Sequence, residues 1–309
     1  MPVISIVFSF RNEEEVLSEL VHRVVPIVEI IGDYELIFVN DDSTDRSLDV
    51  LQILRAENSR IKIINMSRCF GVAPCVIAGL AASSGDAVIY MDSDLQDPPE
   101  IIPQMVYEWN NGADIVHTVR TQRHGESASK MWITKMAYKA INVFSDVYLI
   151  ENAGDFKLLS RLVVKEILQL DEIDPYLRGL SVWVGFNQTV VKYEREARSL
   201  GQSKFGLFMS LNPYKEFLRG ITSFSTVPLY FALFLGLAVS AISFILFCYV
   251  IVMKTLGVNL PGWTAIMSAI LFLSGVILGT NGLLGIYVGK IYEYAQGRPK
   301  YIIKKQIGF

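Results

Sequence analysis

Two pairs of aspartates stand directly after short apolar segments. Asp41 and Asp42 follow one such segment, and Asp92 and Asp94 follow another, with Ser93 between them. In the second pair, carboxylate oxygens at this short spacing suit a Mg²⁺ or Mn²⁺ ion that is shared with a diphosphate, although such pairs also arise by chance in acidic loops. The sequence therefore predicts an acidic site for a metal and a diphosphate, while a turn or a helix cap is the alternative for the first pair.

Basic residues are spread through the second half of the same acidic region. Guanidinium groups bind phosphate oxygens in a fork, so these residues are candidates for an anionic ligand, although each alone is more typical of a solvated surface charge. The candidates are Arg120, Arg123, Arg178, Arg195, Arg198 and Lys204. No GxGxxG or GxxxxGK[ST] string occurs, so a dinucleotide fold or a P-loop has no support.

Alternating apolar and amphipathic segments must position these residues. Strands are expected at 4–10, 35–40, 61–65, 87–91 and 114–119, and helices at 14–30, 46–57, 72–82 and 100–110. A strand–helix–strand repeat predicts an α/β fold with a mostly parallel sheet that is covered on both faces. Ligands bind beyond the carboxyl ends of such strands, and both aspartate pairs and the loop at 11–14 fall at that edge.

Composition divides the 309-residue chain into two parts. The first 219 residues hold 22 basic and 30 acidic residues, a net charge of −8, whereas the remainder holds six basic residues and one acidic residue, a net charge of +5. The whole chain is 51% hydrophobic with a net charge of −3, which excludes a general nucleic-acid binder and a disordered chain. Its three cysteines are unpatterned and fit a head in the reducing cytosol.

Two long uncharged segments dominate the second part. One separates Arg219 from Lys254 and the other separates Lys254 from Lys290, and each exceeds the roughly 20 apolar residues that a membrane-spanning helix needs. We therefore predict spans at 227–253 and 263–287, joined as a hairpin. Basic residues before the first span and after the second place the head and both termini in the cytoplasm, at the inner or plasma membrane.

Two further segments, 127–150 and 206–224, carry basic and aromatic residues among apolar ones. They suit helices that lie on a membrane surface, and packing on the sheet is an alternative of equal weight. Glycines at GxxxG spacing in the second span are a candidate helix-packing face, within the hairpin or in a homo-oligomer. These glycines are Gly275, Gly279, Gly285 and Gly289.

Seven strings in order carry a resemblance to a known family. They are VNDDSTDRS, SRCFG, MDSDLQDPPE, AGDFKLLSR, YLRGLSVWVGF, REARSLGQSKF and GITSFSTVPL. Together they resemble the polyprenyl-phosphate glycosyltransferases of family 2, which include dolichyl-phosphate mannose synthase and bactoprenol-phosphate glucosyltransferases. The match runs from about Ile4 to Pro228, and the tail with two spans resembles the bactoprenol branch. The resemblance implies a GT-A head, a nucleotide-sugar donor, Mg²⁺ or Mn²⁺, and a lipid-phosphate acceptor.

The resemblance also implies roles for individual residues. The donor-binding residues are Ser9, Arg11, Glu13, Asp41, Asp42, Asp92, Ser93, Arg120 and Arg198. The residues for the lipid phosphate are Arg123, Ser127, Arg195, Ser203 and Lys204. The metal ligands are Asp94, Gln96 and Asp92, and the catalytic residues are Asp94 and Asp155. Asp155 matches the residue proposed as a base, but a phosphate monoester is already largely anionic at neutral pH, so an orienting role stays open.

Three strings depart from the family pattern. The usual P-x-Y-N-E reads SFRNE at 9–13, which leaves base recognition open. The usual R-N-F-G-K reads RCFGV at 68–72, and the usual D-F-R reads DFK at 155–157. Both aspartates of the Asp92–Asp94 pair and Asp155 are retained, so the departures concern the identity of the sugar more than the class of reaction.

The expected activity is the transfer of a sugar to a polyprenyl phosphate such as undecaprenyl phosphate, in one inverting displacement. Glucose from UDP-glucose is the first candidate, and N-acetylglucosamine, mannose and a modified arabinose are alternatives. A catalytically silent membrane scaffold that binds a nucleotide-sugar is another, as is a processive polysaccharide synthase, although its Q-x-x-R-W string does not occur. The expected partners are the donor, the lipid, the membrane, a second copy of the chain and a downstream flippase.

The domain organisation follows from these observations. We expect four consecutive parts: a cytosolic GT-A catalytic domain, an amphipathic juxtamembrane helix, two transmembrane helices, and a basic cytoplasmic tail. Their expected boundaries are 1–205, 206–225, 226–290 and 291–309.

Overall fold

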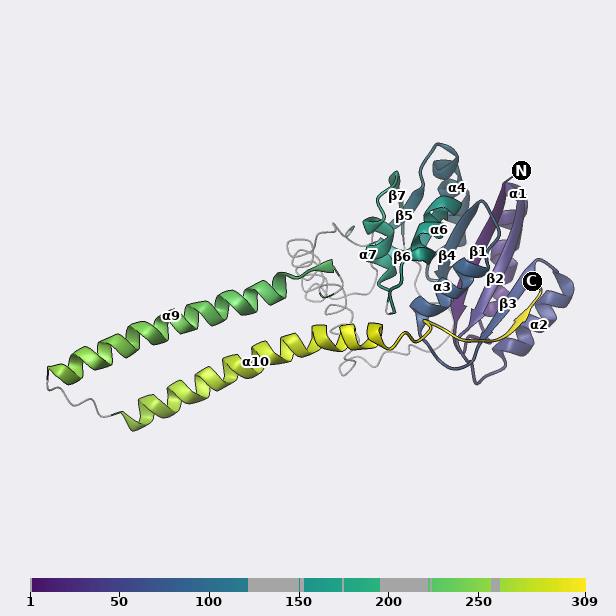
Figure 1. Ribbon diagram of the computed structural model, residues 1–309. Helices are drawn as coiled ribbons and strands as arrows, with labels where there is room; N and C mark the ends of the chain where they lie inside the picture. Colours follow the sequence, from purple (N-terminus) through teal and green to yellow (C-terminus); the bar gives the residue numbers. More distant parts are fainter. Residues whose placement is uncertain are drawn as a thin grey trace. The chain divides into compact units, whose positions relative to one another are not determined.

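The computed structural model describes most of the chain and divides it into two compact units (Figure 1). The described residues are 2–121, 150, 153–173, 175–194, 222, 224–256 and 262–309. The first unit is the α/β head, which includes the last eleven residues of the chain, and the second is a pair of long helices. Each unit is described separately.

An eight-stranded sheet forms the centre of the head (Figure 1). Its strands are β1 (Val3–Phe10), β2 (Asp33–Asn40), β3 (Ile61–Met66), β4 (Ala87–Asp92), β5 (Ile115–Arg120), β6 (Ala153–Ser160), β7 (Gln188–Tyr193) and β8 (Ile303–Ile307). They lie in the order β7-β5-β6-β4-β1-β2-β3-β8. The neighbours of β6 and the pair β3–β8 are antiparallel, and the remaining pairs are parallel. The prediction of a mostly parallel α/β sheet is confirmed.

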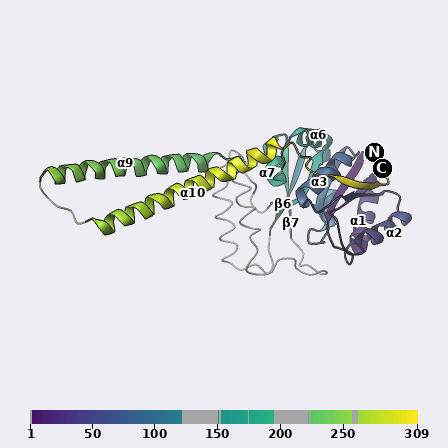
Figure 2. The ribbon, with the colours of Figure 1, turned by 60° about the horizontal axis from the view of Figure 1, so that its bottom comes forward.

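Helices cover both faces of this sheet (Figure 2). They are α1 (Leu17–Ile31), α2 (Ser47–Glu57), α3 (Val72–Ala82), the short 3-10 helix η1 (Pro99–Ile101), α4 (Ile102–Asn110), α6 (Arg161–Gln169) and α7 (Leu177–Trp183). Residues of α1, α2 and α4 enter one apolar core, and residues of α3, α6 and α7 enter the other. Strands such as β2 are apolar on both faces because each face meets one of these cores.

Three strands were not among the five expected from the sequence. Two of them, β6 and β7, lie beside β5, and β6 carries the string that contains Asp155. The third, β8, comes from the segment expected to be a basic tail, and it pairs with β3. Its sequence IKKQI is short and charged, which is typical of an edge strand and gives little signal of its own.

A buried carboxylate ties the first three strands together at the end of the sheet opposite the aspartate pairs. Glu35 is 4% exposed and accepts hydrogen bonds from Ser5 Oγ at 2.5 Å, the backbone nitrogen of Ser84 at 2.6 Å and Lys62 Nζ at 2.6 Å. Burial raises the pKa of Glu35, but these bonds and the charge of Lys62 outweigh it, so the folded-state pKa lies below the ordinary value of 4.5. This part of the stability is present above about pH 4.5 and is lost as the pH falls through the folded-state pKa.

We therefore expect Glu35→Gln to lower the free energy of unfolding by about 2 kcal/mol at pH 7, because the amide cannot accept hydrogen bonds from all the donors that the carboxylate satisfies. The measurement is the melting temperature of the full chain in detergent between pH 3.5 and 7. The difference in melting temperature between Glu35→Gln and the wild type should become smaller as the pH falls. The exposed Glu57 supplies the control Glu57→Gln, and equal melting temperatures for both variants at pH 7 would contradict the prediction.

The second unit is a hairpin of two helices, α9 (Val227–Thr255) and α10 (Trp263–Ala295). Segments Val227–Met253 and Ser268–Ala295 are long and apolar enough to cross a membrane, with mean hydropathies of 2.5 and 1.9. Within this unit, the hydroxyl of Tyr287 donates to the backbone oxygen of Ser225 at 2.8 Å. A Cβ built on any of the four GxxxG glycines would meet no atom of the described residues within 4 Å, so α9 does not pack closely on that face.

Candidate active site

The carboxyl ends of β1, β2 and β4 lie together, as the sequence predicted. Phe10 is opposite Asn40 in the parallel pair β1–β2, and Ser9 is opposite Asp92 in the pair β1–β4. The loops that leave these strands therefore begin side by side at one edge of the sheet. This register brings the first aspartate pair and the Asp92–Asp94 pair to the same edge.

The loop after β1 is tied to the loop after β2. The backbone nitrogen of Asn12 donates to Ser43 Oγ at 2.9 Å, and Asn12 Oδ1 accepts from the backbone nitrogen of Thr44 at 2.8 Å. Asn12 has a φ of 55°, in the left-handed region that asparagine tolerates better than most residues. Glu13, a predicted donor-binding residue, is 9% exposed, and its backbone nitrogen donates to Ser47 Oγ at 2.9 Å. The two loops form one wall of the site.

Asp41 holds the loop that follows β3. Its carboxylate accepts hydrogen bonds from the backbone nitrogens of Phe70 at 2.7 Å and Gly71 at 3.0 Å, and from Cys69 Sγ at 3.2 Å. Arg11 Nη1 lies 3.1 Å from the same sulfur. Burial, followed by the hydrogen bond and charge of Asp41, raises the pKa of the Cys69 thiol. Asp41 therefore fixes the conformation of the loop after β3, whereas its neighbour Asp42 is exposed.

The Asp92–Asp94 pair lies among other carboxylates. Burial, followed by the charges of Asp155, Asp94 and Asp97, raises the pKa of Asp92 to about 7. Asp94 Oδ1 accepts from the backbone nitrogen of Gln96 at 3.2 Å, which turns the chain back beside the pair. The structure thus brings the two predicted catalytic residues, Asp94 and Asp155, into one acidic cluster.

This cluster fits a divalent cation. The neighbouring carboxylates repel the ionised form of Asp92 and so raise its pKa, and a positive ion between them would offset this repulsion. Among the described residues there is no group of three or more His, Cys, Asp or Glu side chains arranged to hold a metal ion. Magnesium and manganese are commonly held by one or two carboxylates and by substrate phosphates, so the cluster suits an ion that arrives with a diphosphate.

Asp97 was not found by sequence reasoning. It is 1% exposed and receives a hydrogen bond from the hydroxyl of Tyr193, and Arg120 Nη2 lies 3.3 Å from both of its carboxylate oxygens. Arg120 Nε also donates to the Tyr193 hydroxyl at 2.9 Å. Gly154 makes room for this arginine, because a Cβ there would lie 3.0 Å from Arg120 Nη2. The third aspartate of the string MDSDLQDPPE was the available signal.

Asp155 on β6 is paired with Arg178 on α7. Arg178 Nε donates to Asp155 Oδ1 at 2.8 Å, and Arg178 Nη2 donates to Oδ2, which makes a two-pronged ion pair. Burial raises the pKa of Asp155, but the charge and hydrogen bonds of Arg178 outweigh it and hold the pKa below its usual value. Asp155 is therefore ionised at neutral pH and is a weak base, which favours an orienting role.

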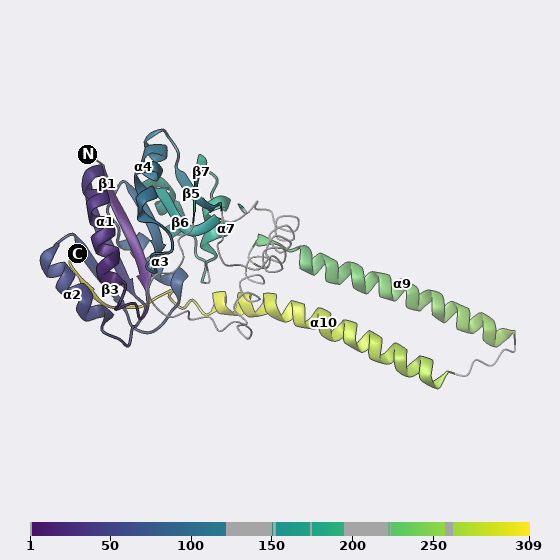
Figure 3. The ribbon, with the colours of Figure 1, turned by 180° about the vertical axis from the view of Figure 1, so that it is seen from behind.

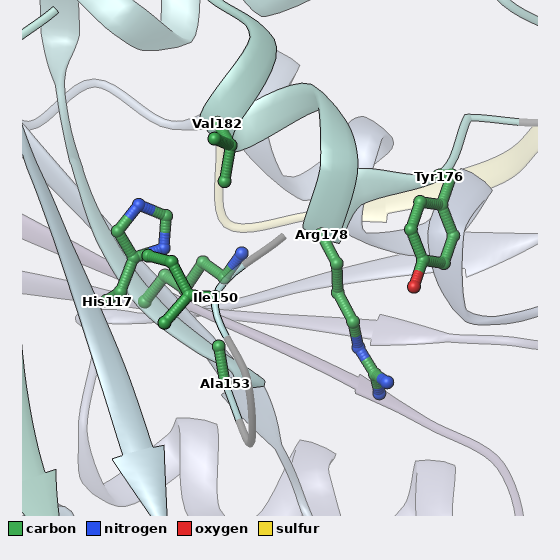
Figure 4. Close-up of a pocket in the computed structure, with 7 residues that line it drawn as sticks. His117, Ile150, Ala153, Tyr176, Arg178 and Val182 are labelled. Carbon is green, nitrogen blue, oxygen red and sulfur yellow. The ribbon is translucent and has the colours of Figure 1, made fainter. Parts of the chain in front are cut away.

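A small cavity of about 10 Å³, the size that a single water molecule needs, lies next to this ion pair (Figure 4). His117, which borders it, is fully buried with Nε2 2.9 Å from Gln188 Oε1, while Nδ1 has no partner among the described residues. Burial, followed by the charge of Lys157, lowers the pKa of His117 to about 3. The imidazole is therefore neutral.

Lys157, which is close enough to Asp155 and Arg178 to feel both charges, donates a hydrogen bond to Ser181 Oγ at 2.6 Å. It is 1% exposed, and burial, together with the charge of Arg178, lowers its pKa from 10.5 to about 7 against the opposing effect of Asp155. The unfolded chain binds this proton more tightly than the folded chain. As the pH falls from about 10.5, the buried side chain therefore lowers the free energy of unfolding, and most of this decrease has occurred by about pH 7.

We expect Lys157→Met to raise the melting temperature at pH 7 by several degrees, because it removes this protonation cost while keeping most of the apolar stem. The gain should fade as the pH rises from 7 towards 10. Thermal scans of the full chain in detergent across that range measure it. A melting temperature that falls at pH 7 would contradict the prediction, and the exposed Lys304 gives the control Lys304→Met.

Six predicted site residues lie outside the described residues. They are Arg123, Ser127, Arg195, Arg198, Ser203 and Lys204. Segment 127–149 and most of 206–224 lie outside them too, so their predicted roles at the membrane or the lipid phosphate stay predictions.

A mostly parallel α/β sheet whose carboxyl edge carries an Asp-x-Asp pair within a carboxylate cluster defines the class of GT-A glycosyltransferases. The model of the family described as Glycosyl transferase family 2 matches residues 5–168, and the chain belongs to this family. The resemblance predicted from the strings is thereby confirmed.

Relatives extend this likeness over nearly the whole chain. The chain is 39% identical over 304 residues to the SfII prophage-derived bactoprenol glucosyl transferase of Shigella flexneri, covering 98% of this chain and 97% of the relative. It is 41% identical to an uncharacterized glycosyltransferase of Synechocystis sp., and the match covers 97% of this chain and 94% of that relative. One solved structure with a similar fold is glucosyl-3-phosphoglycerate synthase from Mycobacterium tuberculosis, in complex with Mn²⁺ and UDP-glucose. It is 20% identical in sequence with a TM-score of 0.47, and the match covers 72% of this chain and 77% of that chain.

Proposed function

We propose that this protein transfers glucose from UDP-glucose to a polyprenyl phosphate at the cytoplasmic face of the membrane, with inversion at the anomeric carbon. The observation that carries the proposal is the carboxylate cluster around Asp92, in a chain that matches a bactoprenol glucosyl transferase over 98% of its length. The two apolar helices support an acceptor that resides in a membrane.

The reaction is a single in-line displacement. An oxygen of the lipid monophosphate attacks the anomeric carbon, the bond from that carbon to the diphosphate oxygen breaks, and the nucleoside diphosphate leaves with the electron pair. The second pKa of a phosphate monoester is about 6, so the nucleophile is already largely anionic at neutral pH and needs no strong base. This agrees with the ionised, arginine-paired state of Asp155, which we assign to orienting the reactants.

Asp94, Gln96 and Asp92 would hold Mg²⁺ or Mn²⁺, which when bound offsets negative charge on the leaving diphosphate. Ser9, Arg11, Glu13 and Ser93 stand at the same edge and are assigned to the donor, with Asp41 shaping the loop beside it. Arg120 is hydrogen-bonded to Asp97, so we assign it to holding this acidic cluster in place beside the donor phosphates, as Arg178 holds Asp155. The lipid phosphate would be bound by residues outside the described part of the chain.

The test is a donor screen on the purified full chain in detergent with Mn²⁺ and undecaprenyl phosphate. UDP-glucose, UDP-N-acetylglucosamine and GDP-mannose, each labelled in the sugar, are compared for a chloroform-soluble product. A lipid-linked product from UDP-glucose alone supports the proposal, and a product from another donor changes the sugar but keeps the reaction. UDP binding without product from any donor would contradict it. Omitting undecaprenyl phosphate is the control for label that partitions without transfer.

The proposed orientation places the head and both termini in the cytoplasm, because the basic residues flank the hairpin on its two outer sides. A flippase would then be needed to carry the lipid-linked sugar to the opposite face. Cysteine labelling tests this orientation in sealed vesicles, with a reporter cysteine placed after Phe309 or at one of residues 257–261, which connect the two helices in the sequence. Access from the same side for both positions would contradict the hairpin.

A further inference from the structure

The last eleven residues of the chain return from the apolar helices to the sheet of the head (Figure 3). Strand β8 runs antiparallel to β3, with Ile307 opposite Ile63 at one end and Ile303 opposite Met66 at the other. The Ile303–Met66 end lies at the carboxyl edge of β3, which is the edge that carries the candidate active site. The chain beyond the second span is therefore part of the sheet that builds the site.

One further hydrogen bond carries this pairing beyond the strand. The backbone nitrogen of Ser67 donates to the backbone oxygen of Ile302 at 2.9 Å. Ser67 begins the loop 67–71, whose far end binds the Asp41 carboxylate through Phe70 and Gly71. A continuous run of contacts thus leads from the C-terminal segment through a five-residue loop to Asp41.

Contacts besides the strand hydrogen bonds hold the C-terminal segment to the head. Tyr301 and Ile303 pack against the same apolar core as Phe70. Lys300 Nζ donates to the backbone oxygen of Leu170. At the other end Lys62 Nζ lies 5.2 Å from the centre of the Phe309 ring. Side-chain contacts at both ends of the segment therefore add to its backbone hydrogen bonds with β3.

We infer that segment 299–309 is a positioning element of the donor site, which fixes loop 67–71 so that Asp41 and the amides of that loop are in place before the nucleotide binds. The inference rests on the proposed function for the identity of the ligand. Without the Ile302 contact, the loop would sample other conformations and binding would have to order it, which weakens affinity without altering the chemical step. The donor site is then complete only after the chain has been made beyond both apolar helices.

The first test removes one hydrogen-bond donor. Ser67→Pro abolishes the backbone N–H that reaches Ile302, and the strand conformation of Met66 is the one preferred before proline. Ser67→Ala loses the same side chain but keeps the N–H, so it is the matched control. In the full chain in detergent, we expect Ser67→Pro to raise the KM for the donor and the Kd for UDP about tenfold with kcat within about twofold of wild type. Amide exchange at Cys69, Phe70 and Gly71 should also accelerate.

A second pair of variants separates positioning from stability. Ile303→Ala and Ile307→Ala remove the same atoms from two half-buried positions of β8, at the site end and at the opposite end. We expect both to lower the melting temperature and only Ile303→Ala to raise the donor KM. Equal KM values for this pair, or an effect of Ser67→Pro that Ser67→Ala reproduces, would overturn the inference.

The two proposals fail in different ways. If wild-type protein makes no lipid-linked sugar from any donor, the proposed function fails. UDP affinity and amide exchange need no acceptor, so they still test the role of segment 299–309. Unchanged UDP affinity and unchanged exchange in Ser67→Pro would overturn the positioning role even if glucosyl transfer is demonstrated.

Discussion

Asp94→Asn is expected to lower kcat about 1,000-fold at saturating Mn²⁺, because the amide cannot replace a carboxylate that helps to offset charge on the leaving diphosphate. The substitution also removes one of the charges that raise the pKa of Asp92, so the folded head should become slightly more stable without metal. Initial rates over a Mn²⁺ titration measure the first effect, and thermal scans without metal measure the second.

The exposed Asp33 at the start of β2 supplies the matched control, because Asp33→Asn is the same change of charge and shape at the opposite end of the sheet. It should leave the rate and its Mn²⁺ dependence unchanged. Asp94→Asn with wild-type kcat at saturating Mn²⁺ would show that Asp94 is not a metal ligand. A loss of rate accompanied by a lower melting temperature would instead indicate damage to the fold.

Asp155→Asn is expected to lower kcat about 100-fold while the remaining activity still rises with pH through about 6, where the acceptor phosphate loses its second proton. Asparagine keeps one oxygen for Arg178 but removes the negative charge that the guanidinium faces across 2.8 Å. The arginine then loses its fixed orientation beside the acidic cluster. Rates between pH 5 and 8 with saturating metal and donor measure the effect.

The pH dependence separates the two roles that the sequence left open for this residue. If Asp155 were the base, its removal would leave hydroxide to take the proton, so the rate would keep rising above about pH 7 instead of levelling off once the phosphate has lost its second proton. That outcome would contradict the orienting role. Arg178→Lys is the companion variant, because it keeps the charge but loses the fork. We expect it to lower kcat about tenfold and to keep the same pH dependence.

Local patterns in the sequence were sufficient to predict five strands of the head and two long apolar helices. Strand β4 is a continuous apolar run that ends in Asp92, β1 is a mostly apolar run that is followed by Arg11, and α9 contains no charge between Val227 and Met253. Such signals depend on neighbouring residues alone. The carboxyl-edge rule then placed Asp41 and Asp92 at one edge without any knowledge of the packing.

The contacts that give the candidate site its character were decided only by the tertiary structure. Asp97 and Tyr193, which form a hydrogen bond, are 96 residues apart in the sequence, and Asp155 and Arg178 are 23 residues apart. Strand β8 pairs with β3 although both long helices lie between them in the sequence. Each of these pairings depends on which strands become neighbours in the sheet. The sequence by itself therefore determined five of the strands, the two long apolar helices, the acidic edge and the family, because these follow from local periodicity and from strings of residues. Burial and long-range pairing decided the charge states of Asp92, Asp155 and Lys157, since a pKa depends on which groups fold against it rather than on those beside it in the chain.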